Sequence, residues 1–192
     1  MGTFVDTEGT RTAIRDLLKS IGEDPYRPGL TGTPGRVAEA YAELFEGYAT
    51  DPVALLAPLP EEEAHGLIMV RGVELVSFCE HHLLPFIGQA AVAYLPGPDG
   101  RICGLSKLSR LIEALSRRLQ VQERLVAQAA DALEEALQPS GVFVMVEAEH
   151  LCMTIRGARK PGATMVTVEA RGALADPQEK ANLIALARDP EA

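Results

Sequence analysis

Apolar residues recur at helical spacing in the first 50 residues and predict two amphipathic helices. The first is expected over residues 10–21, before a glycine that ends it. The second is expected to start at Thr33 and Pro34, an N-cap followed by a proline at the first helical position. We interpret residues 1–50 as an N-terminal helical extension and the proline-rich, acidic residues 51–66 as a solvated loop.

Short runs of Val, Ile and Leu replace the helical spacing further along the chain and predict strands. The first run carries Arg71-Gly72 near its middle, which indicates either one bulged strand or two strand pieces. Residues 96–100 form a turn that is too short for a crossover, so the strands on either side of it are expected to be antiparallel. The expected strands cover residues 67–78, 86–95, 101–103, 142–146 and 164–170.

Two further amphipathic segments, residues 106–119 and 121–137, predict long helices between the first and last strands. Each has one apolar face that must be buried against another element. We therefore expect an α+β fold, in which an antiparallel sheet carries two long antiparallel helices on one face, over residues 67–172. Residues 173–192 are expected to form a C-terminal tail with one short helix.

Composition and charge narrow the classes of partner and compartment. The 192 residues are 47% hydrophobic and 23% charged, and no apolar run approaches the roughly 18 residues of a membrane span. A net charge of -9 argues against a nucleic-acid binder, so an anionic ligand would need a local basic cluster. The first ten residues lack the apolar segment of a secretory signal, and the three cysteines suit a reduced compartment, so we expect a cytoplasmic protein without a membrane role.

The main candidate for chemistry is the run Cys79-Glu80-His81-His82. Cys79 and His82 have the spacing by which a tight turn brings two ligands onto one metal ion. Cys152 is the expected third ligand, because in extended backbone it shares a face with the nearby His150. Three ligands leave a fourth position for water, which is the pattern of a catalytic zinc. The alternative is a closed, structural site in which His81 or His150 is the fourth ligand.

Two other segments predict contacts with a ligand. Ser106 is expected to cap a helix whose first turn carries Lys107 and Arg110, an arrangement that suits an anion but also begins many ordinary helices. Arg156 is a further cation near the expected metal site. Glu123 lies at the junction of the two long helices, where it either belongs to a capping turn or accepts from paired N–H donors such as those of a guanine edge.

Four ordered motifs, within a span from about Thr33 to about Gly172, together resemble those of GTP cyclohydrolase I. They are Cys-Glu-His-His at 79–82, Gly-Leu-Ser-Lys at 104–107, Gln-Val-Gln-Glu-Arg-Leu at 120–125 and His-Leu-Cys-Met-Thr-Ile-Arg-Gly at 150–157. The resemblance implies a tunnelling fold whose sheets join between subunits into a barrel, and a homodecamer with active sites at subunit interfaces. It also implies a zinc-dependent reaction that converts GTP and water into 7,8-dihydroneopterin triphosphate and formate, the first step of pterin and tetrahydrofolate biosynthesis.

The resemblance assigns roles to residues of this chain at the matching motif positions. The implied zinc ligands are Cys79, His82 and Cys152, with one Zn²⁺ per subunit. The implied catalytic residues are His81 and His150, which move protons, together with Ser106. The implied substrate contacts are Glu123, Gln122, Ser106, Lys107, Arg110, Arg156 and Arg36. Glu39 stands where many relatives have a basic residue that helps to bind phosphate, so that contact is not carried over.

Two competing hypotheses remain from the sequence. The first is a catalytically silent assembly protein that holds zinc or a purine in the same fold. The second is a Cys79 nucleophile that a histidine activates without any metal. Metal content and the effect of a chelator on activity separate these hypotheses from the zinc enzyme.

Overall fold

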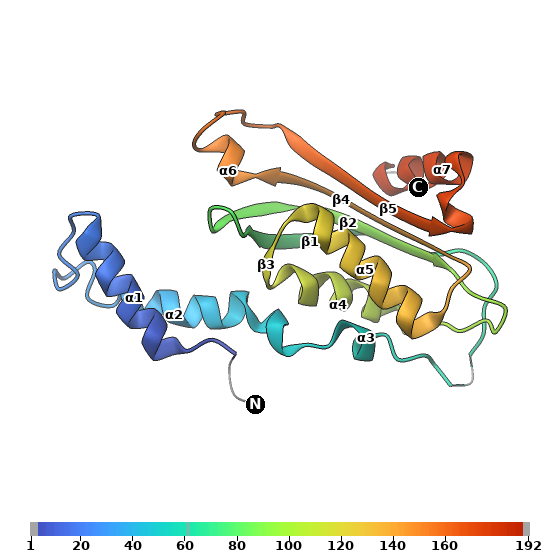
Figure 1. Cartoon of the computed structure of the whole chain (residues 1–192), viewed down its shortest axis with the longest axis horizontal. Coiled ribbons are helices and arrows are strands. Elements are labelled where there is room, and N and C mark those ends of the chain that lie inside the picture. The colour runs from blue at the N-terminus through green and yellow to red at the C-terminus, as the bar shows by residue number, and fades with distance from the viewer. Residues whose placement is uncertain (1–3, 61, 190–192) are drawn as a thin grey trace.

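The computed structural model describes residues 4–60 and 62–189, and its centre is one five-stranded sheet with the strand order β3-β1-β2-β4-β5 (Figure 1). Glu61 of the expected loop and the outermost residues of the expected extension and tail, 1–3 and 190–192, lie outside the described residues. The boundaries of the four expected segments stay a prediction.

Long antiparallel pairings build most of the sheet. The hairpin β1 (Ile68–Cys79) and β2 (Leu84–Leu95) is followed in space by β4 (Gly141–His150) and β5 (Thr164–Gly172). The two-residue strand β3 (Leu119–Gln120) pairs parallel to the end of β1. A register shift between Val70 and Val73 confirms the bulge in the first strand, where Gly72 has a positive φ of 65° that suits glycine.

Helices α4 (Leu105–Ser116) and α5 (Gln122–Leu137) cover one face of the sheet, which confirms the predicted α+β fold (Figure 1). Their apolar stripes pack on alternate residues of the strands, and this contact forms the main hydrophobic core. Fully buried members of that core include Leu111, Leu115, Leu125, Leu133, Val144 and Val146.

The two helices run in opposite directions along the sheet. Helix α4 begins near the end of β2, where the Cys103 backbone N–H donates to the Tyr94 hydroxyl at 3.3 Å. It ends at β3, where Leu119 pairs with Phe78 beside Cys79. Helix α5 then starts at the Cys79 end and returns. The start of α4 and the start of α5 therefore lie at opposite ends of the sheet.

The second face of the sheet is partly covered by α7 (Pro177–Arg188), which follows the short 3₁₀ helix η2 (Ala173–Ala175). The Asp176 side chain accepts from two backbone N–H groups of α7, which confirms the predicted helix start. Leu183 packs there against Ala93 and Met145, and these residues belong to a second, smaller core. The predicted short C-terminal helix is thus docked on the sheet.

The N-terminal helices α1 (Thr7–Ser20) and α2 (Thr33–Leu44) pack on each other and extend away from the sheet (Figure 1). A 3₁₀ helix η1 (Glu46–Ala49) connects them to the core, and the aromatic ring of Phe45 contacts Phe78 of β1. Within the described part of the chain, no helix has both the length and the apolar character needed to cross a membrane.

Three local predictions were wrong. The expected strand at residues 101–103 is only an isolated bridge between Arg101 and Glu63 among the described residues. The expected loop 51–66 contains the short helix α3 (Pro52–Leu55), which Asp51 caps through its side chain. Ser106 does not cap α4: the N-cap is Gly104, and no side chain accepts from the first turn. A glycine before Leu-Ser moves the start of the helix ahead of the serine.

Candidate active site

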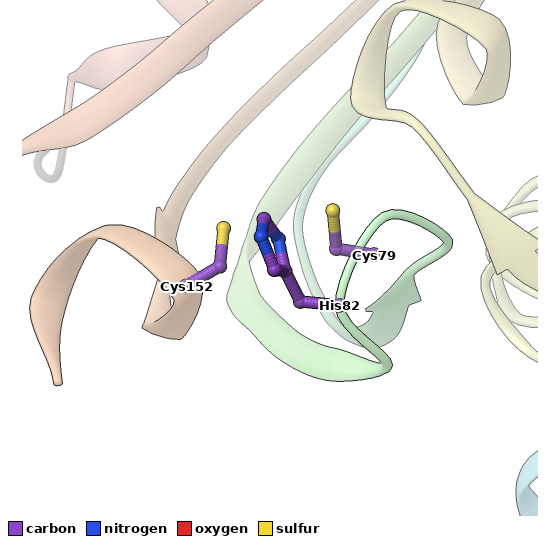
Figure 2. Close-up of side chains that lie close together, drawn as sticks. All are labelled: Cys79, His82 and Cys152. Atoms are coloured by element: carbon purple, nitrogen blue, oxygen red, sulfur yellow. The ribbon is translucent and has the colours of Figure 1, made fainter. Parts of the chain in front are cut away.

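Three predicted metal ligands meet at one end of the sheet. The ligand atoms of Cys79, His82 and Cys152 all lie within 4.8 Å of one another. Figure 2 shows that their side chains converge from two separate segments, the end of β1 with the β1–β2 turn that follows it, and α6 (Leu151–Thr154). The β2–β4 pairing explains the meeting, because it places His150 opposite Phe86 and so brings the end of β4 beside the turn.

Cys152 reaches this group by a different route from the predicted one. The expectation placed His150 and Cys152 on the same face of extended backbone, but the strand ends at His150 and the chain enters the short helix α6. The same-face argument was therefore wrong, although the grouping of Cys152 with Cys79 and His82 was right. A two-residue spacing cannot show by itself whether the backbone stays extended.

The chemistry of this donor set fits a zinc ion. Burial raises the pKa of the Cys152 thiol, and the neighbouring Cys79 thiol raises it further, because two thiolates side by side repel each other. A divalent cation would remove that penalty by binding both sulfurs. Two thiols and one imidazole are ligands that zinc commonly takes in proteins, with a fourth position open in catalytic sites.

The two predicted proton carriers have different surroundings. His81 is exposed, and its Nδ1 lies 3.6 Å from the Cys79 sulfur. His150 is half-buried, and its ring stacks on Phe86 with ring centroids 4.7 Å apart and an angle of 9° between the planes. Burial lowers the pKa of His150, and the Glu123 carboxylate acts in the opposite direction. The structure thus places both histidines beside the thiol cluster, with only His150 held in a packed environment.

The predicted guanine contact and one predicted cation lie at the same end of the sheet. Glu123 is exposed in the first turn of α5, three residues after Gln120, which pairs with Cys79. Arg156 Nη1 donates to His82 Nε2 at 2.7 Å. An exposed carboxylate and a guanidinium are thus available around the histidines and thiols.

Arg124, which the motif analysis did not single out, ties the Cys79–His82 turn to α5. Its guanidinium donates to the Glu80 carboxylate, to the Gln120 side chain at 3.0 Å and to the Leu119 carbonyl at 3.0 Å. The hydrogen bond from Arg124 holds the pKa of Glu80 below its usual range. The Glu80 side chain is thus bonded to a residue of α5. No local sequence signal pairs residues 80 and 124.

The predicted anion-binding residues do not join this group within one chain. Ser106 and Lys107 lie in the first turn of α4, at the opposite end of the sheet from Cys79, and Arg110 follows in the second turn. Arg36 lies on α2, where it donates to the Thr33 hydroxyl at 3.1 Å. The predicted site residues therefore form two sets. The residues predicted to bind the metal and the purine, called the metal group, lie at one end of the sheet. The predicted phosphate-contact residues lie elsewhere.

Comparison with known proteins places this chain in a family. The family model described as GTP cyclohydrolase I matches residues 10–188. The chain belongs to the GTP cyclohydrolase I family. The match extends beyond the span from Thr33 to Gly172 that the four motifs indicated, and it includes most of α1 and all of α7.

Curated relatives support the same assignment over most of their length. The chain is 54% identical over 169 residues to the GTP cyclohydrolase 1 of Thermobifida fusca, which covers 88% of this chain and 82% of the relative. It is 49% identical over 186 residues to that of Streptomyces avermitilis, covering 97% and 92%, and 50% identical over 184 residues to that of Thermoanaerobacter pseudethanolicus, covering 95% and 97%. The prediction of an enzyme of the GTP cyclohydrolase I family is confirmed.

A solved structure shows a more distant likeness. The archaeosine synthase QueF-Like, in its apo form, superposes with a TM-score of 0.45 at 16% identity and covers 57% of this chain and 97% of that chain. The predicted tunnelling fold of the GTP cyclohydrolase I family, an antiparallel sheet with two helices on one face, is the arrangement that the described residues adopt.

Proposed function

We propose that the protein is a zinc-dependent GTP cyclohydrolase that converts GTP and water into 7,8-dihydroneopterin triphosphate and formate. The observation that carries the proposal is the convergence of Cys79, His82 and Cys152 within 4.8 Å beside His150, in a chain of this family. We further propose that the reaction is the first step of pterin and tetrahydrofolate biosynthesis and takes place in the cytoplasm.

The protein side chains have distinct roles in this proposal. A zinc ion held by the two cysteines and His82 would activate water for attack on C8 of the purine, which is a poor electrophile. His150 and His81 exchange protons with the ring nitrogen N7 and with the opening imidazole, because a histidine that is not spent as a ligand can donate and accept near neutral pH. Glu123 accepts from the guanine N–H groups, and Arg156 meets the ribose-triphosphate part.

A triphosphate carries several negative charges and therefore needs several cationic donors. Lys107, Arg110 and the Ser106 hydroxyl, together with Arg36, provide donors for an anion, but they lie away from the metal group of their own chain. We propose that a second copy of the chain supplies these phosphate-contact residues, so that each active site lies at an interface of a homo-oligomer, the predicted decamer. The separation of the two groups along one sheet supports this arrangement.

The reaction itself is tested by product analysis. Purified protein with stoichiometric zinc is expected to release formate from GTP and to yield a pterin that fluoresces after oxidation. A chelator is expected to abolish both products, and added zinc to restore them, because the ligand set holds the ion that activates water. Unhydrolysed GTP bound to zinc-loaded protein would indicate the silent assembly protein, and activity that resists the chelator but not alkylation would indicate the Cys79 nucleophile.

The shared active site predicts that two inactive variants restore each other. Cys152→Ser removes a residue of the metal group, and the double change Lys107→Ala with Arg110→Ala removes two phosphate-contact residues. When the two variants are co-expressed in equal amounts, about one quarter of the sites receive an intact half from each of two copies. Formate release should therefore rise to roughly a quarter of the wild-type rate per site.

Mixing after purification, without exchange of subunits, is the control and should leave both variants inactive. A co-expressed mixture that stays as inactive as its parents, although mass analysis shows mixed oligomers, would mean that both groups of one site come from the same chain.

A further inference from the structure

The side chain of Gln122, the first residue of α5, is fully buried and has all of its polar partners inside the protein. Its Nε2 lies 3.0 Å from each of three oxygens: the Val146 carbonyl, the Met165 carbonyl and the Thr167 hydroxyl. Its Oε1 lies 2.8 Å from His150 Nε2. The residue is 0% exposed, so its amide reaches β4, β5 and the histidine at once.

The two backbone carbonyls decide which way this amide points. A carbonyl oxygen only accepts hydrogen bonds, so the group that faces Val146 and Met165 must be the NH₂ group of Gln122. A flipped amide would direct its oxygen against two other oxygens in a buried place, where none of the three can donate. The amide oxygen of Gln122 therefore faces His150.

This orientation decides the proton position on the histidine. An amide oxygen cannot donate, so His150 Nε2 must carry the hydrogen of the 2.8 Å bond. Neutral His150 then has its lone pair on Nδ1. The stacking of its ring on Phe86 also restricts rotation, so the plane of the ring and its tautomer are both set by neighbours on other elements.

We propose that Gln122 is a positioning residue that holds His150 in the Nε2–H tautomer, so that Nδ1 is the nitrogen that exchanges protons during turnover. The ring takes up a proton at Nδ1 and returns it from Nδ1, while the Nε2–H remains bonded to Gln122. The sequence placed Gln122 among the substrate contacts, whereas its buried side chain acts on the substrate through His150. The kinetic part of this inference rests on the proposed function; the tautomer does not.

The tautomer is measured directly on the full-length protein labelled with ¹⁵N-histidine. The chain has only four histidines, so a long-range ¹H–¹⁵N correlation spectrum is simple, and the signal that disappears in His150→Ala identifies His150. At a pH where the imidazole is neutral, the wild-type His150 signal is expected to show the proton on Nε2. A proton on Nδ1 would overturn the proposal, whatever the variants do.

Two variants test whether Gln122 sets the tautomer of His150. Gln122→Met keeps the size but removes both the donor and the acceptor, so His150 is expected to populate both tautomers and kcat to fall by about 10- to 100-fold. The KM for GTP is expected to stay close to wild type, because the lost interaction acts on the proton carrier and not on substrate binding. Thr167→Val is the matched control: it removes one partner of Nε2 but leaves both carbonyls, so the Nε2–H tautomer should persist.

The outcomes separate the two proposals. An unchanged tautomer in Gln122→Met, or a mixed tautomer with unchanged kcat, would overturn the role of Gln122. Loss of the tautomer in Thr167→Val would show that the carbonyls do not orient the amide. If the wild-type protein releases no formate, the proposed function fails, yet the wild-type spectrum still reports the tautomer. If Gln122→Met does not fold, the wild-type and Thr167→Val spectra decide the structural part.

Discussion

Replacing Cys152 with serine is expected to remove the metal from the protein and with it all measurable formate release. The thiolate is the ligand form of cysteine, and a serine hydroxyl does not ionise near neutral pH, so only Cys79 and His82 would remain as strong ligands. Changes to residues that merely support a ligand cost about 10- to 100-fold in metal affinity, and loss of a ligand itself should cost more. Zinc per chain after dialysis is the primary measurement.

The chain provides a matched control for this change. Cys103 is buried, whereas Cys152 is half-buried; Cys103 lies at the opposite end of the sheet and outside the metal group, and its backbone N–H donates to the Tyr94 hydroxyl. Cys103→Ser makes the same chemical replacement and is expected to retain zinc and turnover. An unchanged zinc content in Cys152→Ser would remove that residue from the ligand set. Melting temperatures of both variants show whether the fold survives.

Replacing His150 with alanine is expected to leave zinc in place while kcat falls by about 10²- to 10⁴-fold, the usual contribution of a positioned proton carrier. The expectation separates this residue from its neighbour Cys152, because the group of converging ligands does not include His150. The change also removes the stacking on Phe86 and leaves the Gln122 amide oxygen without its partner, at a cost of about 1–3 kcal/mol in stability.

Stability and chemistry are separated by measuring zinc content, unfolding and turnover on the same sample. His65→Ala is the control, because His65 is exposed in the segment between α3 and β1 and should affect none of the three. Loss of zinc in His150→Ala would support the closed site in which this histidine is a ligand. Turnover near the wild-type rate would remove His150 from the catalytic residues.

Elements with a strong local pattern could be predicted from the sequence. Both long helices, the bulged first strand and the capped last helix are correct because each depends on residues close in the chain: an apolar stripe, a glycine within a strand, and an aspartate before a proline. The expected strand at 101–103 failed because strand pairing depends on contacts that the local pattern does not contain. The Ser106 cap failed because the helix already starts at Leu105, directly after Gly104.

By itself, the sequence determined the family and the identities of the candidate ligands, because four motifs with ordered spacing carry both. Only the tertiary structure decided how those residues are arranged. The β2–β4 register brings Cys152 to the β1–β2 turn, and the direction of α4 carries Lys107 to the far end of the sheet. The proton position on His150 likewise depends on carbonyls of β4 and β5 that face Gln122. Side-chain type is written in the sequence, whereas register, helix direction and the orientation of a buried amide arise from contacts between segments far apart in the chain.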